Sequence, residues 1–99
     1  MSSPAEIVEE LIKNNKVVIF SKSYCPYCTA TKDLFKQLGV TVVVIELDER
    51  QDGAAIQDYL LTKTGQRTVP NVFVAQKHIG GNDKVQAANK DGTLQKLLA

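Results

Sequence analysis

Two short apolar runs, separated by one amphipathic stretch, most constrain how this 99-residue chain can fold. Residues 16–20 (KVVIF) and 41–47 (TVVVIEL) are rich in β-branched side chains and nearly free of charge, a pattern typical of strands buried on both faces. Between them, residues 26–39 carry apolar side chains at helical spacing, with proline at the first position and glycine at the last. A strand–helix–strand unit of this kind places its two strands in parallel, with a right-handed crossover.

The remaining pattern extends this unit into an α/β fold. Ser2 or Ser3 is expected to cap a first helix, and Glu6 stands at capping-box spacing from Ser3. The other expected elements are a helix from Ala55 to about Thr64, a strand at 72–75, a turn at 76–77, an edge strand at 78–79, a short helix capped by Asn82 or Asp83, and a last helix after Gly92. The last two strands are joined tightly enough to require a hairpin. We therefore predict a mixed four-stranded sheet with helices on both faces, in a single domain covering residues 1–99.

Composition argues against several classes of partner. Twelve Lys and Arg oppose eleven Asp and Glu, and no basic cluster is present, so nucleic-acid binding is not expected. No apolar run approaches the roughly 18–20 residues that span a bilayer, and the first residues lack the pattern of a secretory signal. Two cysteines so close in sequence do not make the disulfide framework of a secreted domain. We predict a cytoplasmic protein with no membrane partner.

The only two cysteines, Cys25 and Cys28, lie where the first strand passes into the second helix. The thiolate is the reactive form of cysteine, and the positive end of a helix dipole favours it, as does a nearby cation such as Lys22. Cys28 lies one turn further along the helix, within disulfide reach. The spacing predicts a redox pair in which Cys25 attacks and Cys28 resolves the mixed disulfide.

The cysteine pair could instead bind a metal or be buried without a chemical role. A zinc site within the chain lacks ligands, because there is no third cysteine and His78 is the only histidine. A metal or cluster held between two subunits remains an alternative, as do two inert buried cysteines. The proline between the cysteines and the helix-start context favour the redox role, and no metal is expected.

Three motifs together give a more specific indication. They are Lys22-Ser-Tyr-Cys25-Pro-Tyr-Cys28, Thr68-Val69-Pro70 and Gly80-Gly81-Asn82-Asp83. With these motifs the chain resembles a dithiol glutaredoxin of the Cys-Pro-Tyr-Cys class, within the thioredoxin-like superfamily. Thioredoxins usually carry Trp-Cys-Gly-Pro-Cys, and this chain has no tryptophan. The resemblance implies a thioredoxin-like fold with strand order 2-1-3-4 and a cis Val69–Pro70 bond.

The resemblance also implies a glutathione site. The expected residues are Lys22, Tyr27, Gln57, Arg67, Thr68, Val69, Pro70, Gly81, Asn82 and Asp83. The Val69 backbone would pair with the extended tripeptide, and the N–H groups of residues 81–83 would bind its γ-glutamyl carboxylate. Lys22, Gln57 and Arg67 are the candidates for the glycyl carboxylate. Tyr24 and Phe73 are expected to be packing residues.

The implied activity is glutathione-dependent thiol–disulfide exchange. Cys25 alone would reduce protein–glutathione mixed disulfides, and Cys25 with Cys28 would reduce protein disulfides. Glutathione is the co-substrate that recycles the oxidised form, and an NADPH-dependent reductase regenerates glutathione. A monomer is expected. Two rival functions are a [2Fe–2S] cluster bridged between subunits, which Pro26 disfavours, and a thioredoxin-type reductase supplied by a flavoprotein.

Overall fold

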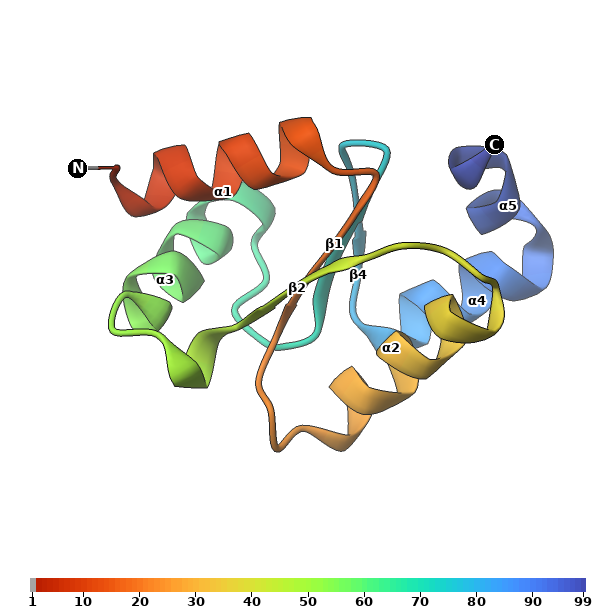
Figure 1. The fold of residues 1–99 in the computed structure, drawn as a ribbon, viewed down its shortest axis with the longest axis horizontal. Coiled ribbons are helices and arrows are strands. Elements are labelled where there is room, and N and C mark those ends of the chain that lie inside the picture. The colour runs from red at the N-terminus through yellow and green to blue at the C-terminus, as the bar shows by residue number, and fades with distance from the viewer. Residues whose placement is uncertain (1) are drawn as a thin grey trace.

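The computed structural model describes residues 2–99 as helices and strands arranged around one mixed sheet (Figure 1). The elements are α1 (Pro4–Asn14), β1 (Val17–Ser21), α2 (Pro26–Gln37), β2 (Val43–Glu46), the 3-10 turn η1 (Leu47–Glu49), α3 (Gly53–Thr64), β3 (Asn71–Val74), β4 (Lys77–Gly80), α4 (Asn82–Asp91) and α5 (Thr93–Leu98). This order agrees with the predicted alternation of helices and strands.

The sheet has the order β2-β1-β3-β4. Strands β1 and β2 are parallel, whereas β3 runs antiparallel to both β1 and β4. The mixed sheet and the strand order 2-1-3-4 are therefore confirmed, and the fold is thioredoxin-like. Because β1 is central and covered on both faces, all five of its residues are buried.

Helices α1 and α3 cover one face of the sheet, and α2, α4 and α5 cover the other (Figure 1). Alternate residues of β1 supply the two cores. Val18 and Phe20 pack with α1 and α3, whereas Val17 and Ile19 pack with the helices on the opposite face. This period of two is the geometry of a strand, and the apolar run at 16–20 reflects the burial of both faces.

Several boundaries differ from the predictions made from the sequence, most of them by one or two residues. The strand expected over 41–47 is shorter and only half-buried, because β2 is an edge strand with a neighbour on one side only. The hairpin turn expected at 76–77 falls at Ala75 and Gln76, whose φ angles are 50° and 69°. Positive φ at both central residues is the condition for the tight turn that suits a twisted hairpin.

The helix starts show one confirmed cap and one correction. At α1, Ser3 and Glu6 form the reciprocal capping box that their spacing predicted. Neither Asn82 nor Asp83 caps α4, because both lie inside its first turn and Gly81 occupies the N-cap position. Gly81 has no side chain to cap the helix, and within the first turn the Asp83 carboxylate accepts only from the Lys84 backbone N–H, at 2.9 Å. Within residues 2–99, no helix is long and apolar enough to cross a membrane.

Candidate active site

The two cysteines lie at the start of α2, and both are free thiols. Cys25 is the N-cap residue, and its Sγ accepts a hydrogen bond from the Cys28 backbone N–H at 3.3 Å. The same sulfur lies 3.8 Å from the Val69 carbonyl oxygen, to which the thiol form donates. Cys25 is partly exposed, whereas Cys28 is fully buried one turn further along the helix. A bulky electrophile can therefore reach Cys25 first.

The surroundings separate the pKa values of the two thiols. Partial burial opposes ionisation of Cys25, but hydrogen bonds from the Cys28 thiol and from the N–H groups of Cys28 and Tyr27, together with the charge of Lys32, hold its pKa below the ordinary value. Burial, followed by the interaction with Cys25, raises the pKa of the Cys28 thiol. A thiolate at Cys25 beside a protonated Cys28 is the arrangement that an attacking and a resolving cysteine require.

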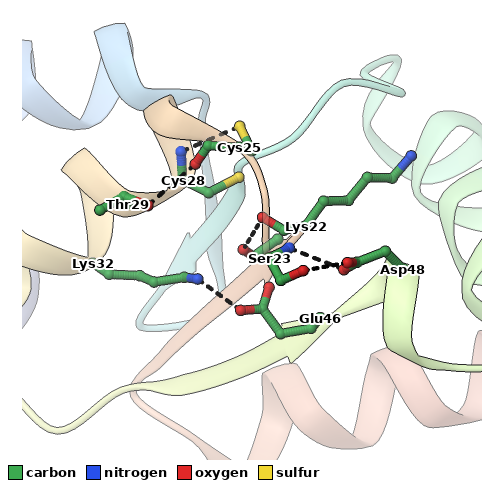
Figure 2. Close-up of polar contacts among 9 residues, drawn as sticks. Lys22, Ser23, Cys25, Cys28, Thr29, Lys32, Glu46 and Asp48 are labelled. Atoms are coloured by element: carbon green, nitrogen blue, oxygen red, sulfur yellow. Dashed lines mark hydrogen bonds and ion pairs between the residues drawn. The ribbon is translucent and has the colours of Figure 1, made fainter.

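Lys32, rather than the expected Lys22, is the cation that favours the Cys25 thiolate. Figure 2 shows the Lys22 side chain extending away from both sulfurs. Lys32 forms an ion pair of 2.7 Å with Glu46 of β2, and both side chains are about one quarter exposed. The sequence did carry a signal for Lys32, because it follows Cys25 by seven residues, or about two helical turns.

Replacing Lys32 with methionine should raise the pKa of Cys25, because it removes a positive charge that lowers this pKa while keeping most of the side-chain volume. Thiolate formation, followed by its ultraviolet absorbance or by alkylation with iodoacetamide, should then begin at a higher pH than in the parent protein. Lys36→Met, an exposed position one turn further along α2, is the matched control and should leave the titration unchanged. An unchanged titration in Lys32→Met would contradict the role of Lys32.

The turn leading into α2 is held from the opposite side by Asp48. This carboxylate accepts hydrogen bonds from the Ser23 hydroxyl and, at 2.9 Å, from the Ser23 backbone N–H (Figure 2). These bonds hold the pKa of Asp48 below its usual range. Within the turn, the Cys25 N–H donates to the Lys22 carbonyl at 3.1 Å. Sequence reasoning missed Asp48, because its partner lies 25 residues earlier and no local pattern joins the two.

A pocket of about 470 Å³ lies beside the nucleophile. It is lined by seven of the ten residues expected to contact glutathione: Tyr27, Thr68, Val69, Pro70, Gly81, Asn82 and Asp83. The Val69–Pro70 bond is cis, as the resemblance implied. Three segments that are far apart in sequence therefore meet at one cavity, next to the sulfur of Cys25.

The other three expected residues do not line this pocket. Gln57 is buried, and its side-chain amide donates to the Arg67 carbonyl at 2.7 Å. Arg67 is exposed and pairs with Asp58 at 3.2 Å. Lys22 lies at the surface on the far side of the cysteine turn, close enough to Asp48 for its charge to act on that carboxylate.

The aromatic side chains near the site are buried or exposed in a pattern that differs in part from the expectation. Phe73 is buried and packs edge-to-face on Phe20, with 6.0 Å between ring centroids, so its packing role is confirmed. Tyr24 was expected to pack but is 71% exposed, in the turn between the end of β1 and the start of α2. Tyr27 is 68% exposed and lines the pocket. The nucleophile is therefore flanked by two accessible tyrosines.

The start of α4 forms the pocket wall opposite Val69 and is anchored to α2. The buried Thr31 hydroxyl donates to the Asn82 side-chain oxygen at 2.9 Å, and Gln86 donates to the same oxygen at 3.2 Å. The Asn82 side chain is thus occupied inside the protein, and what this helix start presents to the pocket is its backbone N–H groups. Such a helix N-terminus is suited to bind an anion.

The described residues contain no group of three or more His, Cys, Asp or Glu side chains that could hold a metal ion. An accessible thiol with a lowered pKa, a buried second thiol with a raised pKa and an adjacent peptide-sized pocket define a dithiol oxidoreductase on a thioredoxin-like fold.

Comparison with known proteins identifies the family. The glutaredoxin family model matches residues 17–79. Glutaredoxin-1 of Rhizophagus irregularis is 50% identical over 99 residues, covering all of this chain and 98% of the relative. A glutaredoxin of Ricinus communis is 54% identical over 90 residues, or 91% of this chain and 88% of that one. The structure of a buckwheat glutaredoxin–glutathione complex superposes with a TM-score of 0.94 at 50% identity, covering 96% of this chain and 86% of that one. The chain belongs to the glutaredoxin family, whose members are glutathione-dependent oxidoreductases.

Proposed function

We propose that this protein reduces protein–glutathione mixed disulfides through Cys25 alone and protein disulfides through Cys25 together with Cys28. The observation that carries the proposal is the position of the Cys25 sulfur, accessible and 3.8 Å from the Val69 carbonyl at the edge of the pocket. A glutathionyl group bound in that pocket would bring its own sulfur to Cys25. All of residues 1–99 would serve as one glutaredoxin domain.

Glutathione is an extended tripeptide with two carboxylates and one ammonium group, and the pocket offers a partner for most of these groups. The Val69 backbone would pair with the peptide as an added strand. The N–H groups at the start of α4 would bind the γ-glutamyl carboxylate, and Asp83 would accept from its ammonium. Tyr27 and Thr68 would contact the remainder of the tripeptide. The binding of glutathione by the buckwheat relative supports this assignment.

The glycyl carboxylate would require a cation or an amide outside the pocket walls. Lys22 is the most available candidate, because its side chain is extended at the surface beside the cysteine turn (Figure 2). Gln57 could offer little beyond its present bond to the Arg67 carbonyl. Arg67 would have to exchange its exposed partner Asp58, an exchange that costs little at a solvated surface.

The monothiol reaction would proceed in two exchanges. The Cys25 thiolate attacks the glutathionyl sulfur of the substrate, the old disulfide breaks, and the protein thiolate leaves and takes up a proton. The thiolate of a second glutathione then attacks the glutathionyl sulfur bound to Cys25, which releases oxidised glutathione and regenerates the Cys25 thiolate. The net reaction consumes one free glutathione: the substrate leaves as a protein thiol, and its glutathionyl group leaves joined to the second glutathione as oxidised glutathione.

The dithiol reaction would use the deeper thiol as well. Cys25 attacks a protein disulfide, and Cys28 loses its proton and attacks Cys25 in the resulting mixed disulfide. The products are the reduced protein and a Cys25–Cys28 disulfide, which two glutathione molecules reduce in turn. A reducing compartment such as the cytosol, with an NADPH-dependent reductase to regenerate glutathione, would keep this cycle supplied.

The decisive test compares electron donors. The protein is offered a glutathionylated peptide with either glutathione and its NADPH-dependent reductase or a flavoprotein thioredoxin reductase. Turnover with the first donor and none with the second is expected, because only the first presents a tripeptide that fits the pocket. Equal or faster turnover with the flavoprotein would overturn the proposal and favour the thioredoxin-type alternative.

A further inference from the structure

Residues 66–70 lie between α3 and β3 without regular secondary structure, and the last three of them, Thr68 to Pro70, form one wall of the pocket. The carbonyl groups of this segment are satisfied by side chains. The Arg67 carbonyl accepts from Gln57 at 2.7 Å, the Val69 carbonyl accepts from Cys25, and the Gln66 carbonyl accepts from Asn71 at 3.4 Å. The conformation of this wall therefore depends on a few side-chain donors.

In the described part of the protein, the Gln66 side chain donates more hydrogen bonds to the backbone of this segment than any other side chain. Its single Nε2 donates to the carbonyls of Thr68 and Pro70, both at 3.0 Å, which lie on either side of Val69. Its own backbone N–H donates to the Thr64 hydroxyl at 3.0 Å, so its main chain is fixed to the end of α3. Because one amide binds both carbonyls, the Val69 peptide groups between them cannot rotate freely.

The same amide also lies against the opposite wall of the pocket. A β-carbon placed on Gly80 would lie 3.7 Å from Gln66 Oε1, and one placed on Gly81 would lie 4.0 Å from Gln66 Nε2 and 3.7 Å from the Pro70 carbonyl. Gln66 therefore packs between the Thr68–Pro70 wall and the start of α4. It does not itself line the pocket.

We infer that Gln66 is a positioning residue for substrate recognition: it sets the direction of the Val69 backbone groups and their separation from the N-terminus of α4. This inference rests on the proposed function, since it assigns Gln66 to the recognition of the glutathionyl group. The backbone bonds that lower the pKa of Cys25 come from α2, and the thiolate has no proton to donate to the Val69 carbonyl, so Gln66 should contribute to binding and leave the thiolate unchanged.

The test uses Gln66→Ala and Gln66→Glu in the full-length protein. The glutamate variant keeps the size of the side chain but replaces the two N–H donors with acceptors facing two carbonyl groups. For a glutathionylated peptide, we expect KM to rise about tenfold in each variant with kcat within about twofold, since two hydrogen bonds of ordinary strength are lost. Gln95→Ala, which removes an exposed glutamine from α5, is the matched control and should behave as the parent protein.

Alkylation of Cys25 by iodoacetamide, which carries no glutathionyl group, separates positioning from a merely structural role. Positioning predicts an unchanged alkylation rate and an unchanged pH dependence in both variants. A parallel loss of alkylation and turnover, or an unchanged KM, would overturn the inference. If Gln66→Ala does not fold, Gln66→Glu and Gln66→Met, which retain the side-chain volume, provide the same comparison.

Failure of the inference can be distinguished from failure of the proposed function. The parent protein is assayed with the same peptide bearing either glutathione or cysteine in the mixed disulfide. If the parent shows no preference for the glutathionyl form, the proposed function fails and the inference fails with it. If the parent shows the preference and the Gln66 variants keep it, only the assignment of Gln66 is wrong.

Discussion

Replacing Cys25 with serine is expected to abolish reduction of a glutathionylated substrate, whereas replacing Cys28 with serine should leave most of that activity intact. A hydroxyl supplies no thiolate at neutral pH and cannot form the mixed disulfide. The loss should be at least about a thousandfold, because removing a catalytic nucleophile has cost as much as about 10⁶ in kcat in another enzyme. Turnover of the glutathionylated peptide, followed by consumption of NADPH by glutathione reductase, measures both variants.

The contrast between the two cysteines follows from their positions. Cys25 is accessible at the helix start and carries the lowered pKa, whereas Cys28 is fully buried with a raised pKa. In the monothiol reaction, a second glutathione attacks the mixed disulfide on Cys25, a step that Cys28 would carry out when the substrate is a protein disulfide. Cys28→Ser should therefore lose the reduction of protein disulfides while keeping deglutathionylation.

The outcome that contradicts this assignment is full activity in Cys25→Ser. Loss of deglutathionylation in Cys28→Ser would show that even the glutathionyl substrate requires intramolecular resolution. Thr29→Ser, an exposed position one residue after Cys28 that keeps its hydroxyl, is the matched control for disturbance of the helix start.

The largest expected effect on stability comes from Gly53→Ala. Gly53 is buried at the first position of α3, where the chain packs directly on η1. A β-carbon built there would lie 1.8 Å from the Leu47 carbonyl oxygen and 2.8 Å from its carbonyl carbon. Because the obstructing atoms belong to the backbone, no change of side-chain rotamer can relieve the clash.

The substitution should destabilise the protein by about 3 kcal/mol or more, the upper part of the range for overpacking a core. For a domain of this size, that loss corresponds to a fall in melting temperature of at least about 12 °C, which thermal unfolding followed by circular dichroism would detect. Ala54→Ser, which also adds one heavy atom but at the next, exposed position of α3, should melt close to the parent protein. A similar melting temperature for Gly53→Ala and Ala54→Ser would contradict the packing argument.

The effect should extend to the active site in any Gly53→Ala molecules that fold. Leu47 immediately precedes Asp48, whose carboxylate holds the Ser23 turn before Cys25. Relief of the clash must move either α3 or the Leu47 backbone, and the second movement would displace Asp48. Alkylation of Cys25 at a temperature where the variant is folded measures this displacement.

Most of the fold and part of the site could be predicted from the sequence. The strand at 16–20, the helix beginning at Pro26 and the cap at Ser3 follow from local patterns, because each depends on neighbouring residues and on the period of a helix or strand. The redox role of Cys25 and Cys28 follows in the same way from their spacing and from the helix start. The ten residues expected to contact glutathione came from the resemblance to the family, and seven of them line one pocket.

Tertiary structure alone decided which residues from separate segments contact one another. The expected cation Lys22 points away from the sulfurs, while Lys32, held by Glu46 on a neighbouring strand, acts on Cys25. Asp48 reaches Ser23 across 25 residues, and β2 is half-buried because it is at the edge of the sheet. Hydrogen bonds and charge interactions depend on distances of a few ångströms between atoms that the chain separates by many residues, and no spacing rule encodes those distances. The sequence by itself thus predicted which sulfur would react, whereas packing determined which groups surround that sulfur and which groups shape the pocket beside it.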